Sequence, residues 1–314
     1  DWNFSLSDNQ KYADRTYNDE SWERIQLPHD WSIKLSFDKK MGGSAAHLPG
    51  GIGWYRKQFK LPRSYNGKVI SILFDAICHQ SDVYINGHHL GFRPYGFCSI
   101  EYDLTPYLDY DGENVIAVRV NRSGVKDVAR WYTGSGIYRH AWLQVTNPVH
   151  VATYGTYVTT PSVSEDKAEI RIMTTLENEL KKVQTVSISH LILDNQGKIV
   201  AKSGTEKTLF EAGQSIKITQ NLTLNYPRLW TLEKPELYTL ETTVKANGKV
   251  TDLYKTPFGI RTIAFDSEKG FLLNGKQVKL KGMCLHQDAG SLGTAVLDRS
   301  YERRLEIIKE YGCN

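Results

Sequence analysis

The chain has 314 residues, a formal net charge of +4 and a hydrophobic fraction of 40%. Such a length exceeds what one hydrophobic core usually supports, so two or three domains are expected. The content of 7 Trp, 18 Tyr and 10 Phe excludes intrinsic disorder. The charges form no basic block and no run of about 18 apolar residues exists, which argues against a nucleic-acid partner and a membrane span.

The strongest local signal is the β-hairpin. Asn-Gly pairs occur at Asn66-Gly67, Asn86-Gly87, Asn247-Gly248 and Asn274-Gly275, each beside strand-like residues. Asn-Gly suits a two-residue turn of type I′, in which both residues have a positive φ. Each pair therefore predicts a tight turn between two antiparallel strands.

Alternating apolar residues mark the strands themselves. Ile116, Val118 and Val120 share one face, whereas Ala117 and Arg119 share the other. His190 alternates with apolar residues in the same way, so we expect it to face a core with a hydrogen-bond partner. Short strands with frequent turn signals predict antiparallel sandwiches.

Helical periodicity emerges only near the end of the chain. Tyr301, Leu305 and Ile308 recur at helical spacing, and Ile307 and Tyr311 widen this apolar stripe, which predicts a helix from Asp298 to Tyr311. Asp298 or Ser300 is expected to cap its start, and Gly312 to follow its end. The preceding run, residues 276–285, has the character of a strand.

Two boundaries divide the chain into three predicted domains. Asn147-Pro148 closes the first β-rich part, because proline cannot donate to a sheet ladder, and the second boundary falls near Ile260. Residues 1–147 fit a jelly roll, residues 148–260 fit an immunoglobulin-like sandwich, and residues 261–314 read as strand, loop and helix. A lone strand and helix cannot bury both faces of the strand, so we expect residues 261–314 to pack against the second domain, associate between chains or fray.

Six stretches together resemble glycoside hydrolase family 2, the family of β-galactosidases and β-glucuronidases. In chain order they are LPHDW (27–31), GWYRKQF (53–59), DVYINGHHLG (82–91), RWYTGSGIYRHAWL (130–143), PRLWTLEKPELYTL (227–240) and FGIRTIAF with FLLNGKQVKLKGMCLHQD (258–265 and 271–288). The resemblance implies a mainly β chain: a galactose-binding-like jelly roll, an immunoglobulin-like domain, and the first βα unit of a catalytic (β/α)₈ barrel.

The same resemblance implies a retaining exo-β-glycosidase, with the β-galactosidase type favoured by the Gly-x-Cys-x-His loop ending at His286. A (β/α)₈ barrel needs about 250 residues, and the two catalytic glutamates of the family lie later in that barrel. We therefore expect the acid/base and the nucleophile beyond Asn314, no catalytic glutamate within the 314 residues, and no turnover by this chain alone. The alternative is a carbohydrate-binding or scaffold module without catalysis.

Five residues are candidates for sugar binding through the resemblance. His286 stands where the family has a histidine that contacts the sugar, against the alternative of a histidine satisfied by backbone at a strand end. Gln287 replaces a carboxylate common in the family, and Asp288 is either a hydroxyl acceptor or a loop cap. Trp131 is a candidate for stacking on a pyranose or for packing between domains. Arg130 stands near the place of an aspartate that helps to hold sugar and a cation in some galactosidases. The nearest acid, Asp127, is a weak substitute for that aspartate, so we expect no metal.

Partners and compartment follow from the same reasoning. A carbohydrate substrate is expected, with no organic cofactor, and homo-oligomerisation stays open. The chain begins with Asp1, as after removal of a signal peptide or an engineered start, so the compartment stays open, with the periplasm or secretion from a bacterium favoured over the cytoplasm. Cys78 and Cys98 are read as buried free thiols, with a disulfide as the alternative.

Overall fold

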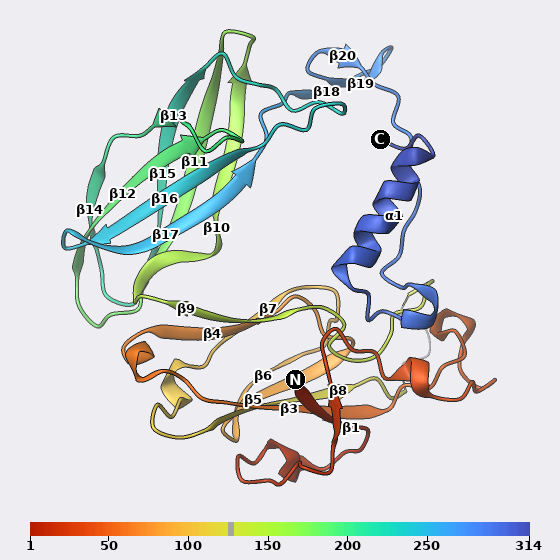
Figure 1. The fold of residues 1–314 in the computed structure, drawn as a ribbon. Helices are drawn as coiled ribbons and strands as arrows, with labels where there is room; N and C mark the ends of the chain where they lie inside the picture. Colours follow the sequence, from red (N-terminus) through yellow and green to blue (C-terminus); the bar gives the residue numbers. More distant parts are fainter. Residues whose placement is uncertain (125–128) are drawn as a thin grey trace. The chain divides into compact units, whose positions relative to one another are not determined.

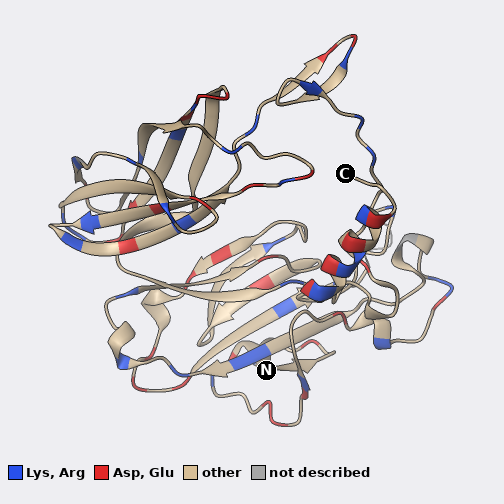
Figure 2. Ribbon diagram, turned by 45° about the horizontal axis from the view of Figure 1, so that its top comes forward, with Lys and Arg blue, Asp and Glu red and all other residues tan. Residues whose placement is uncertain are grey.

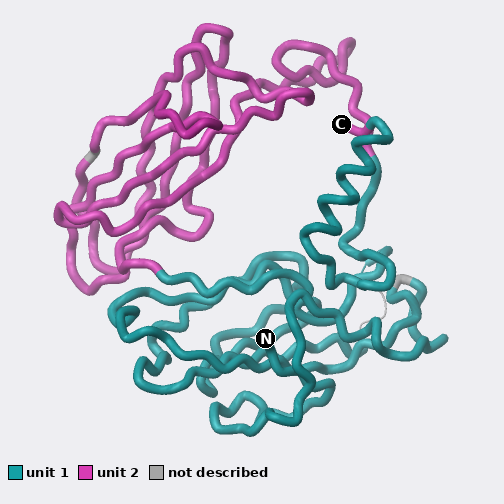
Figure 3. Tube along the Cα trace, in the orientation of Figure 1, with its two compact units in different colours: residues 1–145, 283–312 teal, residues 146–282, 313–314 magenta. Residues whose placement is uncertain are grey.

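The computed structural model describes residues 1–124 and 129–314, apart from the side chains of Ser44 and Glu206. It is mainly β and divides into two compact units, residues 1–145 with 283–312 and residues 146–282 with 313–314 (Figure 3). The expected division into three domains stays a prediction. No helix among the described residues is long and apolar enough to cross a membrane.

The first unit is built on two antiparallel sheets (Figure 1). One has the strand order β2-β1-β3-β8-β5-β6 and the other the order β7-β4-β9. Their bounds are β1 Trp2–Ser5, β2 Glu23–Ile25, β3 Ile52–Phe59, β4 Val69–Phe74, β5 Gln80–Ile85, β6 His88–Arg93, β7 Ile100–Asp103, β8 Asn114–Asn121 and β9 Ala141–Thr146. Short 3-10 helices in this unit span Gln10–Ala13, Ser32–Lys34, Gly43–Ala45, Arg63–Tyr65, Thr105–Tyr107 and Gly290–Leu292.

The core of this unit uses the alternation seen in the sequence. Ile116, Val118 and Val120 of β8 belong to its main buried cluster, whereas Ala117 belongs to a separate small cluster on the other face. Arg119 lies on that second face and is only partly buried. The predicted two-faced strand is therefore confirmed.

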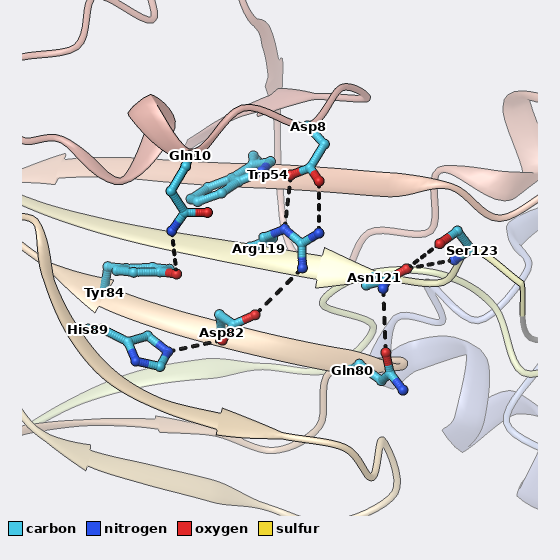
Figure 4. A network of polar contacts seen from close by, with 10 residues as sticks. All are labelled: Asp8, Gln10, Trp54, Gln80, Asp82, Tyr84, His89, Arg119, Asn121 and Ser123. Atoms are coloured by element: carbon cyan, nitrogen blue, oxygen red, sulfur yellow. Dashed lines mark hydrogen bonds and ion pairs between the residues drawn. The ribbon is translucent and has the colours of Figure 1, made fainter.

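Polar side chains cross the second face of the six-stranded sheet (Figure 4). Arg119 donates two hydrogen bonds to Asp8 and lies 3.6 Å from Asp82, which also pairs with His89 at 2.9 Å. Among the described residues no group of three or more His, Cys, Asp or Glu side chains could hold a metal ion. His89 contacts Asp82 and belongs to this polar network on the sheet.

The second unit contains two facing sets of strands and a small three-stranded sheet. The strand orders are β10-β11-β15, β13-β12-β16-β17 with β14 beside β12, and β18-β19-β20. Their bounds are β10 Val149–Val163, β11 Lys167–Asn178, β12 Gln184–Leu193, β13 Ile199–Lys202, β14 Glu206–Phe210, β15 Gln214–Asn225, β16 Tyr238–Ala246, β17 Lys249–Phe258, β18 Ile263–Asp266, β19 Gly270–Leu273 and β20 Lys276–Gln277.

Three of the four Asn-Gly turns join paired strands as predicted. Asn86, Asn247 and Asn274 all have φ near +50°, and the turns connect β5 to β6, β16 to β17 and β19 to β20. The prediction for Asn66 is wrong: its φ is −60°, and β3 and β4 on either side belong to different sheets. With Gly67 at φ +83°, residues 65–68 form a type II turn that changes sheets.

The end of the chain departs from expectation in three respects. The strand expected at residues 276–285 stops at Gln277, because no described strand pairs with the rest. Helix α1, Asp298–Glu310, forms and is followed by Gly312 in the left-handed region, but its N-cap is Leu297 without a side-chain cap. Residues 283–312 pack with residues 1–145. We expected packing against the second domain, association between chains or fraying, so this expectation is wrong.

The last residue, Asn314, bonds to the segment that follows β20. Its backbone N–H donates to the Lys281 carbonyl at 3.0 Å, and its Nδ2 donates to the Lys279 carbonyl at 3.2 Å. Its Oδ1 accepts from the Lys281 N–H at 3.0 Å. Asn314 therefore pairs with three backbone groups of this segment. The catalytic glutamates expected beyond Asn314 stay a prediction.

Helix α1 also leaves its apolar stripe open. Charged residues of both signs occupy much of the helix (Figure 2), and Arg299 pairs with Glu306. Leu305 is 59% and Tyr311 81% exposed, so the described residues leave this part of the stripe uncovered. The contacts that hold the segment come instead from the loop before the helix.

The cysteines are all free in the structure. Cys78 is buried, and burial raises the pKa of its thiol to about 12. Cys98 is exposed, so the expectation of a buried thiol is wrong there.

Each unit buries a histidine in its neutral form. His29 Nδ1 lies 2.9 Å from Tyr55 Oη, and His190 Nδ1 lies 3.0 Å from Thr242 Oγ1, as predicted for His190. Burial lowers the pKa of each ring to about 4. In the unfolded chain both histidine rings have a pKa near 6.5. Between pH 4 and pH 6.5 the unfolded state therefore binds more protons than the folded state.

We predict that the free energy of unfolding falls as the pH drops from 6.5 to 4, by up to about 3 kcal/mol for each histidine. Urea unfolding at pH 7 and pH 4.5 measures this. His190→Gln removes one titrating group, so the variant should lose less stability over that interval than the wild type. An unchanged loss in His190→Gln would contradict the prediction.

Candidate functional site

Trp131, His286 and Gln287 come together in the first unit although 155 or more residues separate Trp131 from the other two. The Trp131 indole Nε1 donates to Gln287 Oε1 at 3.0 Å. The centroids of the Trp131 and His286 rings lie 4.8 Å apart, with an angle of 32° between the ring planes. Three of the five candidate residues therefore form one cluster.

The amide of Gln287 is oriented by its neighbour. An indole N–H only donates, so the amide oxygen must face Trp131 and Nε2 must face away. Nε2 is buried and has no hydrogen-bond partner among the described residues. Leaving a buried donor unpaired costs about 1–3 kcal/mol, so this amide is suited to an acceptor from outside the chain, such as a sugar hydroxyl.

The loop that carries His286 and Gln287 is held by helix α1. Tyr301 Oη donates to the Gln287 carbonyl at 3.1 Å, and the Arg304 guanidinium donates to the Asp288 carbonyl. These bonds fix the backbone of the loop and leave the His286 ring exposed. The imidazole is thereby available to a ligand.

The other two candidates do not join the cluster. Arg130 is exposed, and the contact recorded for Asp288 is made by its backbone carbonyl. Asp127, the acid nearest to Arg130 in the sequence, lies outside the described residues. The structure therefore adds no support for sugar binding by Arg130 or by the Asp288 carboxylate.

Asp30 is a central residue that the sequence analysis missed. Its side chain is buried, with 1% of the residue exposed. Oδ1 accepts from the backbone N–H groups of Ser32 and Ser135, both at 3.1 Å. Oδ2 accepts from Tyr132 Oη at 2.8 Å and from the Thr294 N–H and Oγ1 at 3.0 and 3.1 Å.

These five bonds join three separate segments of the chain. Thr294 belongs to the loop before α1, and Tyr132 is adjacent to Trp131. Burial raises the pKa of Asp30, and the hydrogen bonds from Thr294, Tyr132 and Ser32 act in the opposite direction. The only sequence signal for this residue was its place in the LPHDW stretch.

Gly134 allows the segments to approach this closely. Its φ is +71°, and a Cβ at this position would overlap Thr294 Oγ1 and lie 2.8 Å from Asp30 Oδ2. A side chain here would push the loop before α1 away from Asp30.

We predict that Asp30→Asn lowers the free energy of unfolding of the first unit by about 2–3 kcal/mol, because the amide group places a donor against donors. Thermal unfolding followed by circular dichroism measures the effect. The matched control is Asp111→Asn, since Asp111 pairs with Arg63 on the surface with 77% of its side chain exposed. The control should change stability by less than about 1 kcal/mol, and equal effects of the two substitutions would contradict the prediction.

Comparisons with known proteins cover the whole chain. Residues 1–148 match the family model described as "Glycosyl hydrolases family 2, sugar binding domain", and residues 149–261 match "Glycosyl hydrolases family 2". All of this chain aligns with the Beta-galactosidase BoGH2A of Bacteroides ovatus at 46% identity, and the aligned part makes up 37% of that protein. It is 36% identical to a Beta-glucuronidase of Formosa agariphila, of which it covers 34%.

Solved structures agree with this. A glycosyl hydrolase family 2 member from Bacteroides cellulosilyticus matches with a TM-score of 0.92 and 39% identity, over all of this chain and 43% of that one. A Bacteroides uniformis beta-glucuronidase matches with a TM-score of 0.90 and 30% identity, over 38% of its length. The chain spans less than half the length of each of these relatives and aligns with them along its whole extent: it belongs to glycosyl hydrolase family 2.

Proposed function

We propose that the chain is the N-terminal part of a retaining exo-β-glycosidase and that Trp131, His286 and Gln287 form one wall of its sugar-binding pocket. The observation that carries the proposal is the contact of these three side chains, which leaves a buried amide donor unpaired beside an exposed imidazole. Aromatic faces with a few convergent polar groups are typical of small-ligand sites.

Each side chain has a distinct role in this proposal. The Trp131 ring stacks on the C–H face of a pyranose. Gln287 Nε2 donates to a hydroxyl oxygen, and the His286 imidazole donates to a second hydroxyl with a bond that strengthens as charge develops on the sugar ring. None of these groups cleaves the glycosidic bond.

Cleavage with retention needs two carboxyl groups about 5–5.5 Å apart, one as acid and base and one as nucleophile. We place both beyond Asn314, in a (β/α)₈ barrel whose first βα unit begins within residues 261–314. The partial coverage of the relatives supports this assignment, since the chain corresponds to 37% of the Bacteroides ovatus protein.

A β-galactoside is the proposed substrate. Support comes from the Gly-x-Cys-x-His loop at residues 282–286 and from the higher identity to a protein named Beta-galactosidase, 46%, than to one named Beta-glucuronidase, 36%. The second candidate is a glycan-binding module without catalysis. It is favoured by the description of the model that matches residues 1–148 as a sugar binding domain.

We predict that the natural protein carrying this chain hydrolyses an aryl β-galactoside and that residues 1–314 alone do not. Release of nitrophenol from p-nitrophenyl β-D-galactopyranoside, with the β-D-glucuronide in parallel, measures both. Turnover by residues 1–314 would contradict the placement of the catalytic carboxyl groups. Saccharide binding without turnover by the natural protein would favour the binding module.

We predict further that His286→Ala lowers kcat/KM of the natural protein by about 10²-fold, as expected for loss of one donor that acts mainly in the transition state. The control is His88→Ala, because His88 is exposed and its ring stacks on Tyr107 at 4.6 Å, away from the cluster. Activity of His286→Ala equal to that of His88→Ala would refute the role of His286.

A further inference from the structure

A short segment between β6 and β7, residues 94–99, is anchored at its centre. Gly96 is buried, and its carbonyl accepts from Tyr138 Oη at 2.8 Å. A Cβ on Gly96 would lie 2.9 Å from the Ile77 carbonyl oxygen and 3.0 Å from His79 Nδ1. The backbone of the segment is therefore held against residues 77–79, which precede β5.

Two aromatic residues flank this anchor and do not contribute to the core. Tyr95 is 57% exposed, and Phe97 is half-buried. Neither belongs to a hydrophobic core cluster of the described residues. Their ring centroids lie 5.4 Å apart with 68° between the ring planes, so the edge of one ring packs toward the face of the other.

The pair continues the cluster of the candidate site. The Phe97 and Trp131 rings lie 6.4 Å apart at 58°, and Trp131 in turn contacts His286. The four rings Tyr95, Phe97, Trp131 and His286 thus form an unbroken series within the first unit. Gln287, whose Nε2 has no partner among the described residues, joins this series through its hydrogen bond with Trp131.

We propose that Tyr95 and Phe97 form a second saccharide position next to the site of Trp131, His286 and Gln287. It would take the sugar on the leaving-group side of a β-linked oligosaccharide, so the chain selects oligosaccharides over simple monosaccharide glycosides. The inference rests on the proposed function, because the first sugar must lie against Trp131.

The chemistry of the position favours a saccharide. A pyranose presents C–H groups on a face that matches an aromatic ring and hydroxyls on its rim that stay in water. The tilted rings offer such faces in a fixed arrangement, since Gly96 holds the segment that carries them. A preorganised platform of this kind loses little conformational entropy on binding.

Isothermal titration of the natural protein tests the second position. The ligands are methyl 1-thio-β-D-galactopyranoside and an S-linked β-disaccharide with galactose at its non-reducing end, because sulfur in place of the glycosidic oxygen resists cleavage during the titration. The variants are Tyr95→Ala and Phe97→Ala. Each variant loses one ring on which the second sugar stacks, so each should bind the disaccharide about three- to tenfold more weakly. Both should bind the methyl glycoside as the wild type does.

Trp131→Ala and Tyr226→Ala are the controls. Trp131→Ala should weaken binding of both ligands. Tyr226 is 78% exposed and lies in the second unit, so its removal should change neither.

The outcomes separate the two proposals. Wild-type affinity for the disaccharide in both Tyr95→Ala and Phe97→Ala overturns the second position, as does a disaccharide that binds no tighter than the methyl glycoside. If the two variants instead unfold at lower temperature with unchanged affinities, the rings pack against protein. Failure of the wild type to bind either ligand overturns the proposed function and the second position together.

Discussion

The buried carboxylate of Asp30 is the constraint on which the rest of the first unit depends. A charge this deeply buried is tolerated only when its oxygens are fully paired, and here five donors from Ser32, Tyr132, Ser135 and Thr294 converge on it. Removing any one segment would leave the others around an unsatisfied charge. The network therefore sets where the loop before α1 can lie, and α1 needs no buried apolar stripe of its own for that placement.

The candidate site is a consequence of this docking. Tyr132 bonds to Asp30, and its neighbour in the chain, Trp131, bonds to Gln287. The loop of Gln287 is held at one end by Thr294 on Asp30 and at the other by Tyr301. Polar bonds thus fix the backbone on both sides of the cluster while the indole, the imidazole and one amide donor remain free of core packing. This is the arrangement expected of a binding site built on a rigid support.

Sequence patterns predicted those features whose causes are local. The two faces of β8 follow from alternation at Ile116 and Val118, and the turn at Asn86 follows from the φ that Asn-Gly permits. Features that depend on distant partners were not predictable in this way. Residues 278–285 have the composition of a strand yet form none, since a strand is completed by its neighbours and no described strand pairs with them. For the same reason Leu305 is exposed although its spacing is that of a buried helix face.

The site residues divide along the same line. Trp131, His286 and Gln287 were identified through a family resemblance, because no local pattern distinguishes a ligand-facing tryptophan from one that packs. Asp30 was not identified at all: an aspartate beside Trp31 gives no sign that donors 102 to 264 residues away will surround it. Tyr95 and Phe97 carry no sequence signal of their own for a similar reason. What makes them a platform is the contact of Gly96 with Ile77 and Tyr138, and that contact exists only once the sheets have formed. In this chain the residues that we propose to bind sugar are placed by tertiary contacts to their neighbours, so the informative question for each exposed aromatic is what holds the backbone next to it.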